Sequence, residues 1–267
     1  MALPLRDDVP TRRFPLVTVT LIAVNVVVFL FLQPSAYQNP PSSNQITSHD
    51  VERSREAAVY AFQWGAVPCE VASGSPRADR PKGCPSSTPG YPLPETKSVY
   101  LALLTSMFLH GSTSHLGGNM LFLWVFGNNV EDRLGRLGFL AFYLIGGVVA
   151  ALGFVFTNVH GGSPLLGASG AIAAAMGAYL VFYPRGRILT VILAGTYQLV
   201  YIPAAVVLAL FFVTQFFTPD NGVAWEAHAI GMGAGFVAAL ALSRLGPIRR
   251  RALNHADDVT VRGGQAF

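Results

Sequence analysis

Long apolar segments, rather than an alternation of apolar and polar residues, dominate this chain. A helix that spans a lipid bilayer needs about 20 apolar residues, and about 17 to 25 are tolerated. Six segments approach this length: residues 16–32, 116–130, 137–157, 165–183, 203–217 and 223–245. The pattern therefore predicts an all-α polytopic membrane protein whose core is a bundle of six transmembrane helices.

Two further apolar stretches are not expected to cross the membrane as whole helices. Residues 99–109 are short and end at a polar string, which is typical of an interfacial or half-submerged segment. Residues 188–202 are interrupted by Gly195 and Gln198. Because proline suits the first turn of a helix, we begin the fifth span at Pro203.

The polar segments divide the chain into regions. Residues 1–15 and 246–267 are polar ends, and the second is expected to be a disordered tail. Residues 33–98 form an extended loop after the first span at 16–32. The other five spans fall in a core at residues 99–245.

Lysine and arginine in short loops predict the orientation, because cytoplasmic loops carry an excess of both. Arginines cluster at four span ends: Arg12, Arg13, Arg133, Arg136, Arg185, Arg187, Arg244, Arg249, Arg250 and Arg251. The loops at 160–164 and 218–222 contain no lysine or arginine. We therefore expect a multi-pass protein of the cell membrane with both termini cytoplasmic and residues 33–98 outside.

Composition supports the membrane class. The chain is 52% hydrophobic and only 12% charged, whereas a soluble domain usually carries about 25% charged residues. Its net charge of +4 forms no basic stripe interleaved with aromatic residues, so nucleic acid is not an expected partner. The two cysteines, Cys69 and Cys84, both lie in the loop at 33–98. They are predicted to pair if that loop faces an oxidising compartment.

Four polar side chains inside the predicted spans are candidates for chemistry: His115, Asn119, Ser169 and His228. Polar groups within a membrane are costly and indicate function. Other interpretations exist, since an asparagine can join helices, a serine can simply pack, and a histidine near a span end can be satisfied by hydrogen bonds.

The depth of these residues favours a shared site. Ser169 precedes Arg185, and His228 precedes Arg244, by 16 residues each. At 1.5 Å per residue, both lie roughly 24 Å above the arginine-bearing boundary. The same count from Arg133 places Asn119 at roughly 21 Å and His115 at roughly 27 Å. Ser169 and His228 therefore lie some 6 Å below the opposite surface of a core about 30 Å thick, and Asn119 and His115 bracket them in height within one layer.

The local sequence suits a nucleophile and its base. Ser169 follows Gly167 and precedes Gly170 at the expected start of a helix, where backbone N–H groups are free to face an oxyanion. His228 precedes Gly231 and Gly235, whose spacing lets two helices approach closely. A serine hydroxyl needs an adjacent base, which a neutral histidine supplies.

Three motifs resemble those of the rhomboid family: HGSTSHLGGN at 110–119, GASG at 167–170 and AHAIGMGAG at 227–235. The resemblance implies a six-helix intramembrane serine protease that cuts transmembrane substrates with a Ser–His dyad. It further implies that Ser169 is the nucleophile, that His228 is the base, and that His115 and Asn119 belong to the oxyanion hole. The family uses no metal or cofactor. Glu131 and Arg133 resemble its Glu-x-Arg pair, although an ordinary charged helix end explains them equally well.

The sequence departs from the family's pattern at two positions, and three other functions compete with proteolysis. Many relatives carry an aromatic residue four positions after the serine, where this chain has Ala173, and Gln63-Trp64-Gly65 lacks the arginine of a family Trp-Arg signature. A zinc protease using His110, His115 and His228 would need a different spacing and an adjacent acid. A transporter would show internal repeats, which are not found. A non-catalytic rhomboid-like protein that binds and routes transmembrane clients is the main alternative.

Overall fold

The computed structural model describes residues 2–40, 47–76, 84–85, 93–194, 196–216 and 224–245. The tail predicted at 246–267 lies outside the described residues, as do residue 217 of the predicted fifth span and residue 223 of the predicted sixth. Two helices, α7 (Arg136–Thr157) and α10 (Trp225–Ser243), are long and apolar enough to cross a membrane by length and composition, and the other apolar helices of the described chain are shorter.

Helices occupy the apolar segments. The first is α1 (Leu16–Val27), which continues into the π-helical turn η1 (Val28–Leu32). The segments α5 (Thr113–Phe122), η5 (Leu123–Gly127) and α6 (Asn128–Leu134) follow one another without a break. The remaining long helices are α7 (Arg136–Thr157), α8 (Ser169–Phe182), α9 (Ala204–Phe216) and α10 (Trp225–Ser243). The short α4 (Ala102–Thr105) and η4 (Ser106–Phe108) cover part of the interfacial segment predicted at 99–109.

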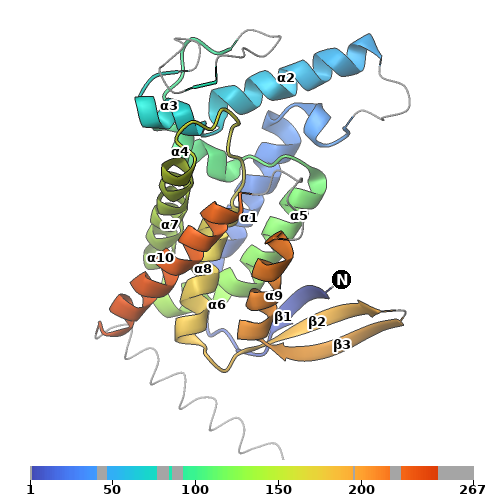
Figure 1. Cartoon of the computed structure of the whole chain (residues 1–267). Helices are drawn as coiled ribbons and strands as arrows, with labels where there is room; N and C mark the ends of the chain where they lie inside the picture. Colours follow the sequence, from blue (N-terminus) through green and yellow to red (C-terminus); the bar gives the residue numbers. More distant parts are fainter. Residues whose placement is uncertain are drawn as a thin grey trace, which may run out of the picture.

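Helix α8 is the centre of the bundle and contacts α7, α9, α10 and η5 (Figure 1). Most of its residues are buried and more than half are Gly, Ala or Ser, so neighbouring helices can pack close to its backbone. The predicted fourth span began too early, at residue 165. Leu165 instead forms a β-bridge with Ala66, and Gly167 has a φ of +127°, which no helix accommodates.

A three-stranded antiparallel sheet at one end of the bundle corrects the all-α prediction. It consists of β1 (Ala2–Asp7), β2 (Arg187–Ala194) and β3 (Thr196–Pro203), in the order β1-β2-β3. The apolar stretch at 188–202 is therefore a hairpin, and Pro203 ends a strand instead of opening α9. Burial raises the pKa of Asp7 to about 6, although hydrogen bonds from Tyr179 and Asn129, which dock β1 on the bundle, lower it.

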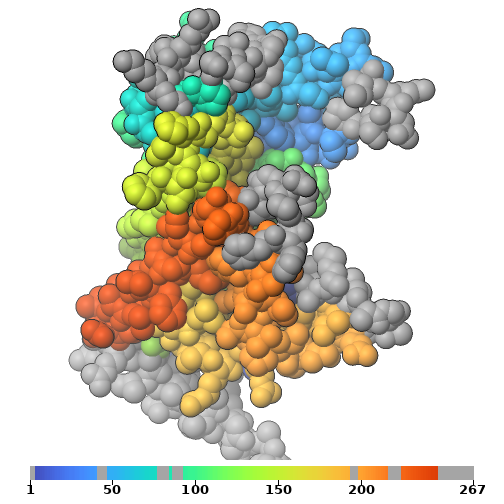
Figure 2. Space-filling view, viewed as in Figure 1, coloured from blue at the N-terminus to red at the C-terminus, as the bar shows by residue number. Residues whose placement is uncertain are grey.

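The opposite end of the bundle carries α2 (Ser48–Trp64), α3 (Pro68–Ser73) and the loops around them. We call the described residues 47–76, 84–85 and 93–98 the loop cap. Figure 2 shows α10 running from the middle of the molecule toward the lower left, with the loop cap above it and the β2–β3 hairpin at the lower right. The described part of the predicted extended loop at 33–98 thus contains α2, α3 and the short 3-10 helix η2 (Ser35–Tyr37). A Thr47–Asp50 capping box begins α2.

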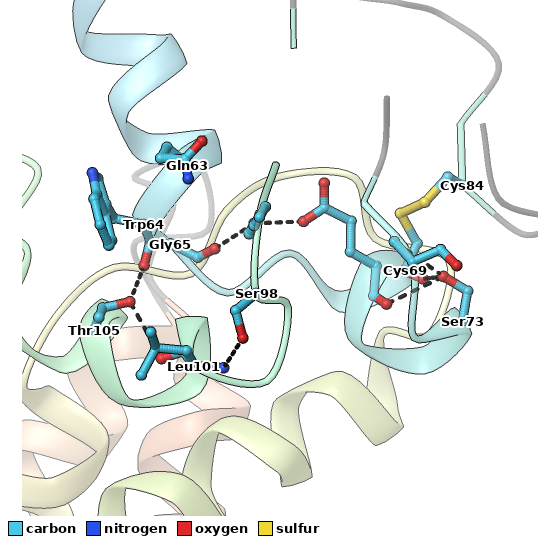
Figure 3. A network of polar contacts seen from close by, with 12 residues as sticks. Gln63, Trp64, Gly65, Cys69, Ser73, Cys84, Ser98, Leu101 and Thr105 are labelled. Atoms are coloured by element: carbon cyan, nitrogen blue, oxygen red, sulfur yellow. Dashed lines mark hydrogen bonds and ion pairs between the residues drawn. A yellow bond between two sulfur atoms is a disulfide. The ribbon is translucent and has the colours of Figure 1, made fainter. Parts of the chain in front are cut away.

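Three contacts hold the loop cap together (Figure 3). Cys69 and Cys84 form a disulfide with a Cα–Cα distance of 5.1 Å. The ammonium of Lys97 pairs with the Glu70 carboxylate and donates to the carbonyl oxygen of Gly65 at 2.8 Å. Burial lowers the pKa of Lys97, and the contact with Glu70 opposes that shift. These contacts fix residues 65–70 beside the segment that leads into α8.

Glu131 caps α1 from a distant part of the chain. Its carboxylate accepts hydrogen bonds from the backbone N–H groups of Val17 and Thr18 at 3.0 and 2.7 Å, and from the Thr18 hydroxyl at 2.8 Å. The first N–H groups of a helix lack intrahelical partners, and a negative charge there also complements the helix dipole. Capping of α1 therefore explains the glutamate of the Glu-x-Arg pair.

We expect Glu131→Ala to lower the free energy of unfolding by about 1 to 3 kcal/mol, because buried backbone donors of α1 lose their acceptor. Thermal unfolding of the detergent-solubilised protein measures the change. Asp132→Ala, one residue along α6, is the matched control and should behave like the unmodified protein. Equal stability of the Glu131 and Asp132 variants would show that α1 does not depend on this cap.

Candidate active site

The structure brings Ser169 and His228 into direct contact. Oγ of Ser169 lies 2.6 Å from Nε2 of His228, within hydrogen-bonding distance. Ser169 is the first residue of α8 and is partly exposed, whereas His228, in the first turn of α10, is buried. Because the first N–H groups of α8 have no intrahelical acceptor, they are available beside the hydroxyl. A hydroxyl, a base and free donors thus share one position at the loop-cap end of α8.

Glycines on α10 allow this contact. A Cβ atom added at Gly231 would lie 2.4 Å from the carbonyl oxygen of Gly170, and one added at Gly235 would lie 2.0 Å from that of Ala174. Both distances are impossible for real side chains, so α8 and α10 touch backbone to backbone. The close approach places His228, three residues before Gly231, opposite the first residue of α8.

His115 and Asn119 lie on one face of α5 and point toward Gly167. The backbone N–H of Gly111 donates to Nδ1 of His115 at 3.4 Å, so the ring proton belongs on Nε2, the atom that faces Gly167. Nδ2 of Asn119 is buried and has no hydrogen-bond partner among the described residues. Two N–H donors therefore converge on the space just before Ser169.

Gly167 keeps that space open. A Cβ at this position would lie 2.9 Å from Nε2 of His115 and 3.6 Å from Nδ2 of Asn119. Its φ of +127° is also a conformation that other residues rarely adopt. The N–H of Gly167 donates to the carbonyl oxygen of Ser106 at 2.9 Å, which holds the turn in place. Glycine is required here both by the backbone and by the space between the donors.

The other side of His228 is held by α9, through two residues that the sequence analysis did not single out. Oε1 of Gln215 lies 2.6 Å from Nδ1 of His228, and the ring of Phe211 lies 5.9 Å from the imidazole, centroid to centroid. These contacts supply the ring support that Ala173 cannot. Gln215 is a strongly polar residue within the apolar segment 203–217. Polar groups within a membrane are costly and indicate function, which makes Gln215 a candidate for the same reason as Asn119.

Other candidates lie outside this cluster. Cys69 and Cys84 belong to the loop cap. His110 is fully buried, and its ring packs edge-on against His115 at a centroid distance of 5.2 Å. The described residues contain no group of three or more His, Cys, Asp or Glu side chains that could hold a metal ion.

Comparison with known proteins gives a family match and several relatives. The sequence profile of the Rhomboid domain matches residues 97–245, more than half of the chain. A presenilin-associated rhomboid-like protein A, mitochondrial, of Danio rerio is 37% identical over 102 residues, or 38% of this chain. The mitochondrial presenilin-associated rhomboid-like protein of Homo sapiens is 38% identical over 104 residues, also 38% of this chain. Rhomboid protease GluP of Bacillus subtilis is 34% identical over 155 residues, or 57% of this chain.

The matched segments span 27% of the first two relatives and 28% of the third. The names of the first two contradict the predicted location in the cell membrane with cytoplasmic termini, because both are mitochondrial proteins. The physical reason for the error is that arginine asymmetry reports the sidedness of insertion and carries no information on which membrane is entered.

Proposed function

This chain belongs to the rhomboid family, and we propose that it is a serine endopeptidase that cleaves transmembrane helices of other proteins within the membrane. The observation that carries the proposal is the 2.6 Å contact between the Ser169 hydroxyl and His228. A nucleophile within hydrogen-bonding distance of a base is the arrangement that covalent acyl transfer requires. The Rhomboid protease GluP, whose similarity covers 57% of this chain, adds support from the family.

In the proposed reaction, Oγ of Ser169 attacks the scissile carbonyl while Nε2 of His228 takes the hydroxyl proton. Collapse of the tetrahedral intermediate breaks the C–N bond, and the imidazolium returns the proton to the leaving amine. A water molecule then attacks the acyl ester, again with His228 as base, and releases the second product. No group other than the substrate and water is consumed.

The developing oxyanion is placed beside Gly167, where Nε2–H of His115 and Nδ2–H of Asn119 meet. The backbone N–H of Ser169, at the start of α8, is the third donor. Preorganised donors in a water-poor site stabilise such a charge strongly, because they need no reorganisation during the reaction. Nδ2 of Asn119, which has no hydrogen-bond partner among the described residues, supports this role, since a buried donor without an acceptor is costly unless the reaction supplies one.

The bundle is proposed to cross the membrane six times, with α1–η1, the α5–α6 segment, α7, α8, α9 and α10 as the spans. The core is proposed to comprise residues 99–245. With six crossings, residues 1–15 and 246–267 would both lie on the arginine-bearing side of the membrane. The loop cap, within residues 33–98, would lie on the opposite side, close to Ser169. Several of these helices are short for a bilayer of average thickness, so we expect the membrane to be thin around them.

The depth of Ser169 decides which substrates are accessible. The carbonyl groups of an intact helix are hydrogen-bonded and shielded, so a serine some 6 Å below the surface can attack only an unwound segment. The substrate is proposed to approach laterally between α5 and α9, where the rings of Phe122 and Phe211 pack 4.9 Å apart, centroid to centroid. Movement of the short α9 would open this path.

We expect a single-span substrate whose outer third is rich in Ala and Gly to be cleaved at least about tenfold faster than one with uniform Leu. Glycine lowers helix stability by about 1 kcal/mol per residue relative to Ala, and about 1.4 kcal/mol corresponds to a factor of ten. Mass spectrometry of the products maps the cut sites. Cleavage near the arginine-bearing side, or equal rates for the two substrates, would contradict the depth argument.

The direct test of the proposed function uses the full chain in proteoliposomes with a fluorophosphonate probe. Labelling that maps to Ser169, together with cleavage of a co-reconstituted single-span substrate, is the expected result. The competing function is a non-catalytic protein that binds and routes transmembrane clients. Client binding without probe labelling and without cleavage would favour that function over proteolysis.

A further inference from the structure

The second ring nitrogen of His228 faces an amide on α9. Nδ1 lies 2.6 Å from Oε1 of Gln215, while Nε2 lies 2.6 Å from Oγ of Ser169. His228 is 7% exposed and Gln215 is 9% exposed, so water does not compete well for either group. We propose that Gln215 is a positioning residue for the proteolytic reaction, holding His228 in the tautomer that accepts the serine proton. The inference rests on the proposed function and extends it to a third side chain.

The orientation of the Gln215 amide is decided by its second contact. Its nitrogen, Nε2, lies 3.2 Å from the carbonyl oxygen of Phe211, which can only accept. The nitrogen therefore belongs toward Phe211, and the oxygen toward His228. Because an amide oxygen cannot donate, Nδ1 of His228 must carry the ring proton. Nε2 of His228 then has a lone pair facing the Ser169 hydroxyl, as a general base requires.

The same contact strengthens as the reaction proceeds. When His228 takes the serine proton, the ring becomes an imidazolium and its Nδ1–H becomes a charge-assisted donor. Hydrogen bonds from ionised donors are roughly twice as strong as neutral ones. An interaction that gains strength toward the transition state raises kcat, whereas uniform binding mainly lowers KM. Loss of the Gln215 oxygen should therefore appear in kcat.

One helix supplies both restraints on the ring. Phe211, one turn before Gln215 on α9, lies against the imidazole, and α8 offers only the methyl group of Ala173 at the position where many relatives have an aromatic residue. His228 itself is carried by α10. The base is thus provided by α10 and oriented by α9, so its ability to accept the serine proton depends on the position of α9.

Three variants of the full chain in detergent test the assignment. Gln215→Leu removes the acceptor, Gln215→Glu keeps an oxygen at the same reach, and Val213→Ala alters an exposed side chain on the same helix. We expect the rate of fluorophosphonate labelling and kcat for a model substrate to fall about 10- to 100-fold in Gln215→Leu, with little change in KM. Gln215→Glu should recover most of this loss, and Val213→Ala should match the unmodified protein.

A spectroscopic measurement separates positioning from packing. The ¹⁵N shifts of labelled imidazoles distinguish the two tautomers, and the His228 signals among six histidines are assigned by their loss in His228→Ala. Proton occupancy of Nδ1 in the unmodified protein, lost in Gln215→Leu, is the expected result. An unchanged tautomer, or a Gln215→Leu labelling rate equal to that of a reactive unmodified protein, would overturn the role of Gln215 and leave the protease intact. If the unmodified protein fails to label, the protease proposal fails and the catalytic role of Gln215 fails with it, and a tautomer change in Gln215→Leu would then show only that Gln215 orients the ring.

Discussion

Replacing Ser169 or His228 with alanine is expected to lower kcat by a factor on the order of 10⁴ to 10⁶. Neither substitution should impair membrane insertion, because a serine at the start of α8 and a histidine in the first turn of α10 contribute little to the apolar core. The two residues act as one unit through their 2.6 Å contact, so the double variant should be little worse than either single variant. Cleavage of a single-span substrate in proteoliposomes measures the effect.

Matched substitutions away from the site control for damage to the fold. Ser163→Ala changes an exposed serine in the segment before α8, and His49→Ala changes an exposed histidine on α2. Both should retain full activity. Robust cleavage by Ser169→Ala would rule out the serine mechanism, and strictly additive losses in the double variant would show that Ser169 and His228 act in separate steps.

The helices of the bundle could be predicted because the membrane imposes a length on apolar segments. The prediction of residues 16–32 matches α1 with η1, and that of 137–157 differs from α7 by one residue. The hairpin of β2 and β3 was not predicted, since a continuous apolar stretch does not by itself distinguish a strand from a helix. Glycine and β-branched residues within 188–202 were the available signal for strands.

Contacts between residues far apart in the chain could not be predicted from the sequence. The Glu131 carboxylate caps α1 across 113 residues of chain, and Lys97 reaches Glu70 across 27. No periodicity encodes such pairs. The candidate cluster could be predicted because Ser169 and His228 each precede an arginine by 16 residues on separate apolar segments. Gln215 was not predicted, although it is a strongly polar residue within the apolar segment 203–217, as Asn119 is within 116–130.

The oxyanion site is expected to account for the second largest effect on activity. Asn119→Ala removes a donor aimed at the space beside Gly167, and loss of one such donor typically lowers kcat by about 10² to 10³. The change in KM should be small, since the donor acts on charge that develops only in the transition state. Asn25→Ala is the matched control, because Asn25 is a fully buried asparagine whose amide donates to Leu21 within its own helix. A rise in KM at constant kcat would make Asn119 a substrate-binding or packing residue.

Gly167→Ala tests the same site without removing any donor. The added methyl group would lie 2.9 Å from Nε2 of His115, in the space proposed for the oxyanion, and the φ of +127° would strain the turn. We expect a loss of kcat of at least about 10², and little further loss when Asn119→Ala is added, because the methyl group already blocks the oxyanion from that amide. Gly74→Ala is a control for strain alone, since Gly74 also has a positive φ, of 73°, but lies in the loop cap. If Gly167→Ala were fully active, the oxyanion would have to lie elsewhere, and the donors of His115 and Asn119 would need another explanation.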